Sequence, residues 1–190
     1  MVAAVTGNDG EPYKAAGEKL VQSEIAHTAA AVQGICLRLL TTRPHSRAEL
    51  IDALCARGIS EEVSKPVLDR LCEVGLVDDT AFAESVVYSG HHGRGLSRRV
   101  LRVELARRGV PDVIADQAVM SINPHAEEQR ARELVRRKQR TSLTRNQRIL
   151  ARRLLGLLAR KGYSDDLAWR VVGEEVGSGP WCEELAPESD

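Results

Sequence analysis

The fold is decided by LLGLLARKGYSDD at residues 154–166, a stretch that has two counterparts earlier in the chain. These are LIDALCARGISEE at residues 50–62 and LRVELARRGVPDV at residues 101–113. Each copy has two leucines four residues apart, then a glycine four residues later, with a basic residue before it and an acid three positions after it. The copies are offset by 51 and 53 residues, and a fixed internal period of this length indicates a repeat array.

Each copy predicts a helix, a glycine turn and a second helix. Leucines four residues apart lie on one helix face, and the glycine can adopt the left-handed conformation that ends a helix in a Schellman turn. These glycines are Gly58, Gly109 and Gly162. Ser60, Pro111 or Ser164 then opens the second helix, which has an acid in its first turn, where the helix dipole favours negative charge.

A further helix precedes each pair, at residues 29–41, 79–89 and 125–140, so nine helices are expected. No stretch alternates apolar and polar residues as a strand does. We therefore predict an all-α fold of three tandem three-helix repeats that form an elongated, curved helical array. The expected divisions are a flexible N-terminal extension (1–27), repeats at 28–75, 76–124 and 125–176, and a flexible acidic tail (177–190).

Two residues fit this scheme poorly. Pro66 falls inside the third helix of the first repeat, where an interior proline costs about 3 kcal/mol. We expect that helix to begin late, at Ser64, or to be distorted. Gly156 weakens the middle of the long basic helix by about 1 kcal/mol relative to alanine.

Composition narrows the possible functions. The chain has one Phe, three Tyr and two Trp, too few aromatic side chains for a base-stacking platform. The longest apolar run, residues 154–159, is too short to cross a bilayer, and the N-terminus does not have the pattern of a secretion signal. We expect a cytoplasmic protein that does not bind membranes.

We expect neither a metal site nor a catalytic site. Cys36, Cys55 and Cys72 fall on or beside apolar helical positions and no CxxC pair occurs, which is typical of small buried residues in a reducing cytosol. The five histidines have no ligand partner at a useful spacing. The chain has no P-loop, HExxH or GxSxG motif, so we predict no enzyme activity and no cofactor.

The net charge is zero, but the charge is unevenly distributed. Residues 125–176 carry thirteen basic and seven acidic side chains, whereas the charges within 28–75 and within 76–124 are balanced. Between Arg130 and Arg153 there are ten basic residues and a single acid, Glu133. Such a strip attracts phosphate backbones or an acidic protein groove; an ordinary solvated helix face is the alternative.

The candidate binding residues for a filament or DNA are therefore basic. Those of the third repeat come first: Arg136, Arg137, Lys138, Arg140, Arg145, Arg148, Arg152 and Arg153. The second choices follow a glycine-punctuated stretch at residues 93–95, and for them a loop and an ordinary helix start explain the sequence equally well. They are Arg94, Arg98, Arg99 and Arg102.

The joint between the first two repeats, GLVDD at residues 75–79 followed by Phe82-Ala83, resembles the RecX family of recombination regulators. In physical terms Gly75 ends a helix, the two apolar residues after it pack the corner, and one of the two aspartates caps the next helix. The resemblance extends over residues 29–176 and includes the capping box at residues 46–49 and all three glycine turns.

This resemblance implies a cytoplasmic, all-helical regulator that binds the RecA recombinase and its filament on single-stranded DNA. It also implies that the protein restrains RecA ATP hydrolysis, strand exchange and co-protease activity, and so acts in DNA repair, homologous recombination and the SOS response. We expect a monomer without an active site. The N-terminal extension and the acidic tail have no role that the resemblance supplies.

Two other interpretations remain open. A helix-turn-helix transcription regulator would bind one duplex sequence preferentially, and a glycine turn between two helices is also typical of that motif. A protein-only scaffold of stacked helices would have no affinity for nucleic acid. We favour filament regulation, in which the repeat array lies along the groove of the RecA–DNA filament, blocks incoming duplex DNA and opposes filament growth.

Overall fold

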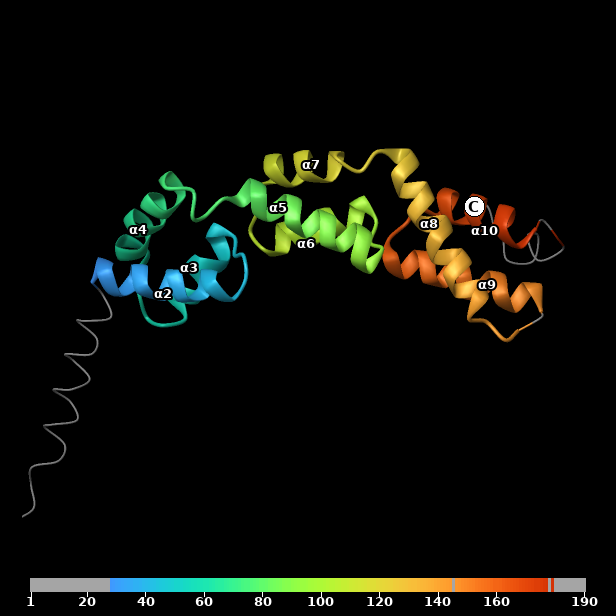
Figure 1. Ribbon diagram of the computed structural model, residues 1–190, viewed down its shortest axis with the longest axis horizontal. Coiled ribbons are helices and arrows are strands. Elements are labelled where there is room, and N and C mark those ends of the chain that lie inside the picture. Colours follow the sequence, from blue (N-terminus) through green and yellow to red (C-terminus); the bar gives the residue numbers. More distant parts are fainter. Residues whose placement is uncertain (1–27, 145, 178, 180–190) are drawn as a thin grey trace, which may run out of the picture. The chain divides into compact units, whose positions relative to one another are not determined.

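Figure 1 shows the computed structural model, which describes residues 28–144, 146–177 and 179. The expected N-terminal extension and nearly all of the acidic tail lie outside these ranges. All regular structure within them is helical, without a strand, and comprises nine α-helices and one π-helical segment. The elements are α2 (Ala29–Thr42), α3 (Arg47–Cys55), α4 (Glu61–Glu73), α5 (Asp79–Tyr88), η1 (Ser89–Arg94), α6 (Arg98–Arg107), α7 (Asp112–Met120), α8 (Pro124–Arg140), α9 (Gln147–Lys161) and α10 (Asp165–Val176).

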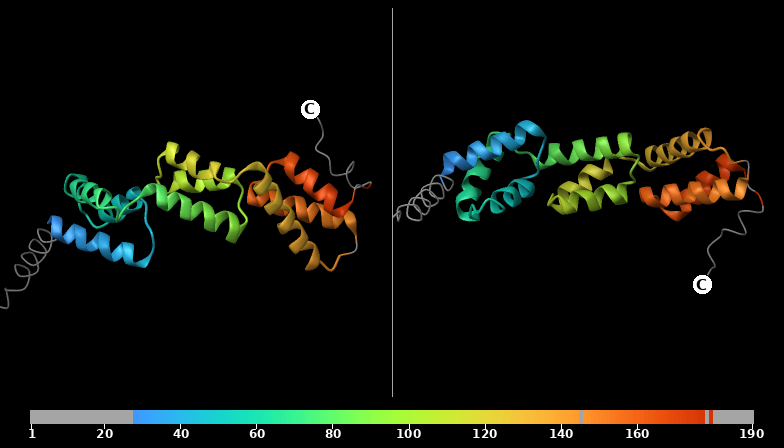
Figure 2. Two further views of the ribbon diagram at one scale, coloured as in Figure 1. Left: turned by 45° about the horizontal axis from the view of Figure 1, so that its top comes forward. Right: turned by 90° about the horizontal axis from the view of Figure 1, so that it is seen from below.

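The chain divides into two compact units between Asp78 and Asp79. The first unit contains α2 to α4, and the second contains α5 to α10. Each group of three helices encloses its own apolar core, and Figure 2 shows the three helices of each group side by side in both views. The paired leucines of the repeated motif are fully buried at the centres of these cores: Leu50, Leu54, Leu101, Leu105, Leu154 and Leu158. Burial of a leucine side chain stabilises the folded state by about 1.5–3 kcal/mol.

The three glycine turns have the predicted conformation. Gly58, Gly109 and Gly162 have φ values of 76°, 70° and 81°, in the left-handed region where a Cβ would clash. In every copy the amide of the next residue donates a hydrogen bond to the carbonyl of the second leucine, at 3.2, 3.1 and 3.2 Å in chain order. This bond defines the Schellman turn, so the predicted helix–turn–helix unit is confirmed in all three repeats.

The predicted helix starts are also confirmed. α4, α7 and α10 each begin one residue after Ser60, Pro111 or Ser164. The Ser46 hydroxyl accepts a hydrogen bond from the Glu49 amide at 3.1 Å, as expected for the N-cap of a capping box. Local capping chemistry therefore determines where most of these helices begin.

Pro66 does not delay the start of its helix. α4 begins at Glu61 and continues without a break to Glu73, so the expected start at Ser64 is wrong. The residue before α4 is extended, and Glu61 and Glu62 favour the N-terminal end of the helix dipole. Pro66 is exposed, whereas Ser64 lies on the buried face, so packing stabilises the first turn in spite of the proline.

The first helix of the second repeat extends further than predicted. After α5 ends at Tyr88 the chain continues as the π-helix η1, and Gly95, with φ 67°, ends it. The glycine-rich residues 93–95 are therefore mainly helical and do not form a loop. Gly90 permits the close packing of this segment, because a Cβ there would lie 2.3 Å from Cδ2 of Leu101.

Two positions expected in the interior are exposed instead. Cys55 is exposed, as are the equivalent residues Ala106 and Ala159. Each directly follows a buried leucine, and successive helical residues lie about 100° apart around the axis, which places them off the buried stripe. Leu76 is 51% exposed, so Val77 alone packs the corner after Gly75.

Candidate nucleic-acid interface

Apart from Arg145, the predicted binding residues of the third repeat lie on α8 and α9, which pack against each other and against α10. The apolar stripe of each helix faces the shared core, so the charged positions between the apolar ones face outward. Asn123 and Asn146 fix the starts of the two helices by accepting hydrogen bonds from the amides of Ala126 and Ile149, at 2.8 and 3.2 Å. α9 contains no acidic residue.

Two arginines of α8, Arg132 and Arg136, are neutralised by carboxylates that include those of α10. Arg136 pairs with Glu175 of α10 at 2.8 Å. Arg132 pairs with Glu174 of α10 at 2.5 Å and with Glu128 of its own helix at 2.6 Å. The hydrogen bond from Arg136 lowers the pKa of Glu175, so this pair remains charged at neutral pH. Arg136, a predicted binding residue, therefore docks α10 onto α8.

Five predicted binding residues are exposed and have no ion-pair partner in the part of the chain that the structure describes. They are Arg137, Lys138, Arg140, Arg152 and Arg153. Arg148 is also exposed but takes part in a contact within the protein. Arg145 lies outside the described residues. The predicted basic strip is thus reduced to the last turns of α8 and the first half of α9.

Two open hollows lie on this basic face. The larger, of 560 Å³, is lined by Lys138 of α8 and by residues of α9: Ile149, Arg152, Arg153, Gly156 and Arg160. The smaller, of 370 Å³, follows one face of α8 and is lined by Arg130, Glu133, Leu134, Arg136, Arg137 and Arg140. No carboxylate lines the larger hollow, whereas Glu133 lines the smaller one. The larger hollow is therefore the stronger candidate for binding an anion.

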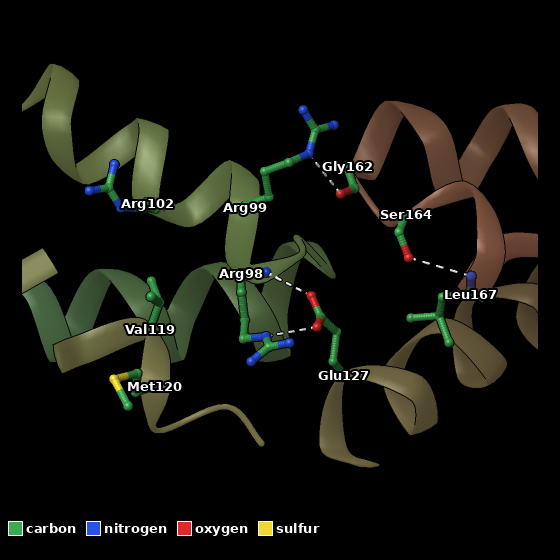
Figure 3. A pocket seen from close by; sticks show the side chains of 9 residues that line it. All are labelled: Arg98, Arg99, Arg102, Val119, Met120, Glu127, Gly162, Ser164 and Leu167. Carbon is green, nitrogen blue, oxygen red and sulfur yellow. Dashed lines mark hydrogen bonds and ion pairs between the residues drawn. The ribbon is translucent and has the colours of Figure 1, made fainter. Parts of the chain in front are cut away.

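The second-choice arginines are held by partners within the second unit. Arg98 donates two hydrogen bonds to the Glu127 carboxylate, one from its Nε at 2.8 Å and one from its backbone amide at 2.9 Å (Figure 3). Arg94 pairs with Glu104 at 2.9 Å. The guanidinium of Arg102 hydrogen-bonds Asp116 and lowers the pKa of that carboxyl. The Nε of Arg99 lies 3.4 Å from the carbonyl oxygen of Gly162, so all four arginines serve the packing of the protein itself.

The contacts of Arg98 and Arg99 belong to a joint between the second and third repeats. The buried Ser97 hydroxyl donates a hydrogen bond to the Gly162 carbonyl at 2.7 Å, and the Ser97 amide donates to the Lys161 carbonyl at 3.0 Å. The buried Tyr163 hydroxyl donates to the Gly95 carbonyl at 3.2 Å. Because the chain around Gly95 is tied to the turn at Gly162, the second and third repeats form one packed body.

Arg130 of α8 also stabilises the joint between the second and third repeats. Its guanidinium donates hydrogen bonds to the carbonyls of His91 and His92 within η1, the first at 3.0 Å. It also pairs with Glu133 at 2.6 Å. The buried His91 ring is held as well, with Nδ1 3.1 Å from the Leu96 carbonyl oxygen. These residues therefore have structural roles in the second unit.

Among the described residues, no group of three or more His, Cys, Asp or Glu side chains is placed to hold a metal ion. Within the same ranges, no helix has the length and apolar character needed to cross a bilayer.

Sequence reasoning did not identify two features of this region. Arg160 lines the larger hollow, but its place just before the Lys161-Gly162 turn suggested only a helix end. Its position seven residues after Arg153, two helical turns along the same face, is a signal that could have found it. The exposed Tyr88 ring stacks on His92, with ring centroids 4.6 Å apart, because η1 continues α5 in a way that helical periodicity does not reveal.

The family models for RecX match each repeat separately. The first three-helix domain of RecX matches residues 34–71, the second matches 78–119 and the third matches 126–172. A protein from Thermobifida fusca named "Regulatory protein RecX" is 48% identical over 174 residues, which are 91% of this chain and 90% of that protein. A protein of the same name from Streptomyces lividans is 51% identical over 146 residues, 76% of this chain and 77% of the relative.

Solved structures share the fold. The crystal structure of RecX from Lactobacillus salivarius matches with a TM-score of 0.67 at 22% identity, over 77% of this chain and 95% of that one. Three matching domain models, close relatives over most of the chain and the three-helix repeats establish the relationship. The chain belongs to the RecX family of regulatory proteins.

Proposed function

We propose that this protein binds the RecA recombinase filament on single-stranded DNA and restrains RecA ATP hydrolysis, strand exchange and co-protease activity. The observation that carries the proposal is the identity of 48% over 91% of the chain with a protein named "Regulatory protein RecX". The setting is DNA repair, homologous recombination and the SOS response in the cytoplasm. The protein acts as a monomer, by occupying the filament and without an active site or cofactor.

The electrostatic part of this binding falls to five predicted binding residues of the third repeat that have no ion-pair partner among the described residues. They are Arg137, Lys138, Arg140, Arg152 and Arg153. A basic surface of this kind draws the protein to the phosphate-rich filament, and the attraction weakens as salt screens the charges. Helices that occupy the filament groove then exclude incoming duplex DNA. Arg94, Arg98, Arg99 and Arg102 contribute indirectly, because they hold the second unit in shape.

RecA ATP hydrolysis on single-stranded DNA, titrated with this protein at low and moderate salt, tests the proposal. We expect hydrolysis to fall as the protein is added, with a weaker effect at the higher salt. Reversing Arg140, Arg152 and Arg153 to Glu should raise the protein concentration needed for half-maximal effect by at least tenfold. Unchanged hydrolysis at saturating wild-type protein would refute filament regulation.

The control for this titration is a variant in which the net charge changes by the same amount at another place on the protein. Reversal of Arg38, Lys65 and Arg107 to Glu changes the net charge equally, because these side chains are exposed and have no ion-pair partner among the described residues. We expect this variant to act like the wild type. Preferential binding of the wild type to one duplex sequence at physiological salt would instead favour a helix-turn-helix transcription regulator.

A further inference from the structure

We propose that α8 and α9 form a seat for the phosphate backbone of a DNA single strand, centred on Gly156. The seat is the larger basic hollow, and its cations are Lys138, Arg152, Arg153 and Arg160. The proposal rests on the proposed function and makes it more specific, since it names the ligand that the third repeat contacts directly, with or without RecA.

Gly156 is the first observation. It lies inside the fifteen-residue helix α9, where glycine destabilises a helix by about 1 kcal/mol relative to alanine. Its φ is not positive, so backbone conformation does not require a glycine. A Cβ at this position would meet only the guanidinium of Arg160, at 3.3 Å, so close packing does not require one either. Because Gly156 has no side chain, it leaves the floor of the hollow open between the cations, so a ligand can approach the backbone of α9 closely.

The charge around this floor is the second observation. Arg152, Arg153 and Arg160 come from one helix, and Lys138 comes from its neighbour, so two helices frame the hollow. None of the four has an ion-pair partner among the described residues, and no carboxylate lines the hollow. Elsewhere on α8, Arg132 and Arg136 are neutralised by Glu128, Glu174 and Glu175. The seat is therefore a place where positive charge is left available for an external anion.

The spacing of the cations suits a nucleic-acid strand. Arg153 and Arg160 are seven residues apart on α9, which is about 10 Å along a helix that rises about 1.5 Å per residue. One strand of B-form DNA carries a phosphate about every 3.4 Å, so the seat spans about three phosphates of a strand in that form. With four cations, one isoleucine and one glycine, the lining contains no aromatic ring. The seat therefore contacts the phosphate backbone of the strand and not its bases, so it confers no sequence preference.

This composition disfavours an acidic protein as the ligand. The centres of protein interfaces are enriched in aromatic residues, methionine and arginine and are depleted of lysine. The hollow has arginines but also a lysine, and it has neither an aromatic residue nor a methionine. Ile149, which is 45% exposed, is the apolar side chain that lines the hollow. Phosphate recognition, in contrast, requires positively charged donors and little apolar surface.

Binding of fluorescently labelled oligothymidylate to the full chain, in the absence of RecA and over a series of salt concentrations, tests the seat. The variant is Arg152→Gln/Arg153→Gln/Arg160→Gln, and the charge-matched control is Arg38→Gln/Lys65→Gln/Arg107→Gln. We expect the seat variant to lose at least tenfold in affinity at low salt. Its slope of log affinity against log salt should be smaller by about 1.4–2.1, which is about 0.7 for each of two or three phosphates.

A second pair of variants leaves every charge in place. Gly156→Leu fills the floor of the hollow, and Gly173→Leu adds the same side chain to α10, where a Cβ would meet nothing within 4 Å. We expect Gly156→Leu to weaken oligothymidylate binding about fivefold while the helical content of the protein is retained. Gly173→Leu should bind like the wild type.

The outcomes separate this proposal from the proposed function. Equal losses in the seat variant and the charge-matched control, or no loss in either, would overturn the seat even if RecA hydrolysis is still restrained. Absence of oligothymidylate binding by the wild type, together with loss of RecA filament binding in the seat variant, would identify an acidic protein surface as the ligand and also overturn it. Failure of the wild type to affect RecA at all would overturn the proposed function and leave the oligothymidylate result to decide the seat.

Discussion

Gly162 has the same backbone conformation as Gly58 but different surroundings. A Cβ at Gly58 would meet nothing within 4 Å, whereas one at Gly162 would lie 2.2 Å from Cγ2 of Val100 and 2.8 Å from Oγ of Ser97. Alanine in the left-handed region costs about 1–2 kcal/mol, and overpacking adds about 1–3 kcal/mol. We expect Gly58→Ala to destabilise its unit by about 1–2 kcal/mol and Gly162→Ala by about 2–5 kcal/mol. Amide hydrogen exchange measures the two units separately, and equal costs would contradict the close approach at Gly162.

Tyr163 combines a buried ring with a hydrogen bond across the joint. Removal of its hydroxyl in Tyr163→Phe leaves the Gly95 carbonyl without this donor, and an unsatisfied buried group costs about 1–3 kcal/mol. Tyr88→Phe is the control, because the Tyr88 side chain is 68% exposed. Urea denaturation should show a loss of stability in the first variant and almost none in the second. A loss of the same size in both variants would show that the hydrogen bond to Gly95 contributes nothing.

The same residue gives the protein a specific alkaline sensitivity. Burial raises the pKa of the Tyr163 phenol above its ordinary value, because the anion loses solvation in the core. The unfolded chain then releases a proton that the folded chain retains, so stability is fully present below about pH 10 and is lost as the pH rises further. The expected slope is about 1.4 kcal/mol per pH unit. Tyr163→Phe should lack this component when stability is measured from pH 9 to 11.

On the scale of a helix, α8 separates two kinds of arginine. Arg136 is paired with Glu175 of α10, whereas Arg140 is exposed and has no ion-pair partner among the described residues. We expect Arg136→Gln to loosen α10 only slightly, since the arginine is exposed and solvent screens its ion pair. Arg140→Gln should instead leave stability unchanged and weaken binding to the RecA filament about threefold. Hydrogen exchange in α10 and filament binding measure the two effects, and the reverse assignment of effects would contradict the division.

The ion pair between Arg136 and Glu175 should also make the stability of the protein depend on pH in the acid range. Arg136 lowers the pKa of Glu175 below its ordinary value, so the pair stabilises the protein at neutral pH. This contribution is lost as the pH falls below the ordinary glutamate value, about 4.3, and through the lowered pKa. Denaturation of Glu175→Gln between pH 7 and pH 3 should show a weaker dependence on pH than the wild type. An identical pH profile would mean that the pair does not form in solution.

The sequence was sufficient for those elements whose chemistry is local. Schellman turns and N-caps involve residues at most five positions apart, so a repeated leucine–glycine pattern predicts all three turns. The predicted start of α4 was wrong because the stabilisation from burying the helix outweighs the cost of the proline. That burial depends on the other two helices of the repeat. The π-helix after α5 was missed for a similar reason, since Gly90 accommodates Leu101 of the next helix.

The candidate site was predicted in location but not in detail. A count of charges found the basic strip, yet it could not separate Arg136 from Arg140, because Glu175 lies 39 residues from Arg136 in sequence. The same limit applies to Arg98, which Glu127 holds from 29 residues away. Pairing between distant charges depends on how helices dock, so charge composition overestimates the surface that remains for a partner.

At the scale of the whole molecule, separate cores predict separate unfolding of the two units. Leu54 lies in the core of the first unit and Leu158 in a core of the second, both fully buried. Truncation of a buried leucine to alanine costs about 2–5 kcal/mol. Leu54→Ala should therefore speed hydrogen exchange in α2 to α4 alone, and Leu158→Ala in the helices from α5 onward. Acceleration throughout the chain by either variant would contradict the division at Asp78.

Within the second unit, the joint predicts that one hydroxyl affects two repeats. Ser97 caps α6 by accepting a hydrogen bond from the Val100 amide at 3.4 Å, and it donates to Gly162 at 2.7 Å. Loss of a cap costs about 1 kcal/mol, and the Gly162 carbonyl also loses a buried donor. Hydrogen exchange should therefore quicken in both α6 and the α9–α10 turn of Ser97→Ala. Ser46→Ala removes the cap of α3, which lies in the first unit, and should act within α2 to α4. If Ser97→Ala affected α6 alone, the two repeats would be neighbours in sequence without being coupled in stability.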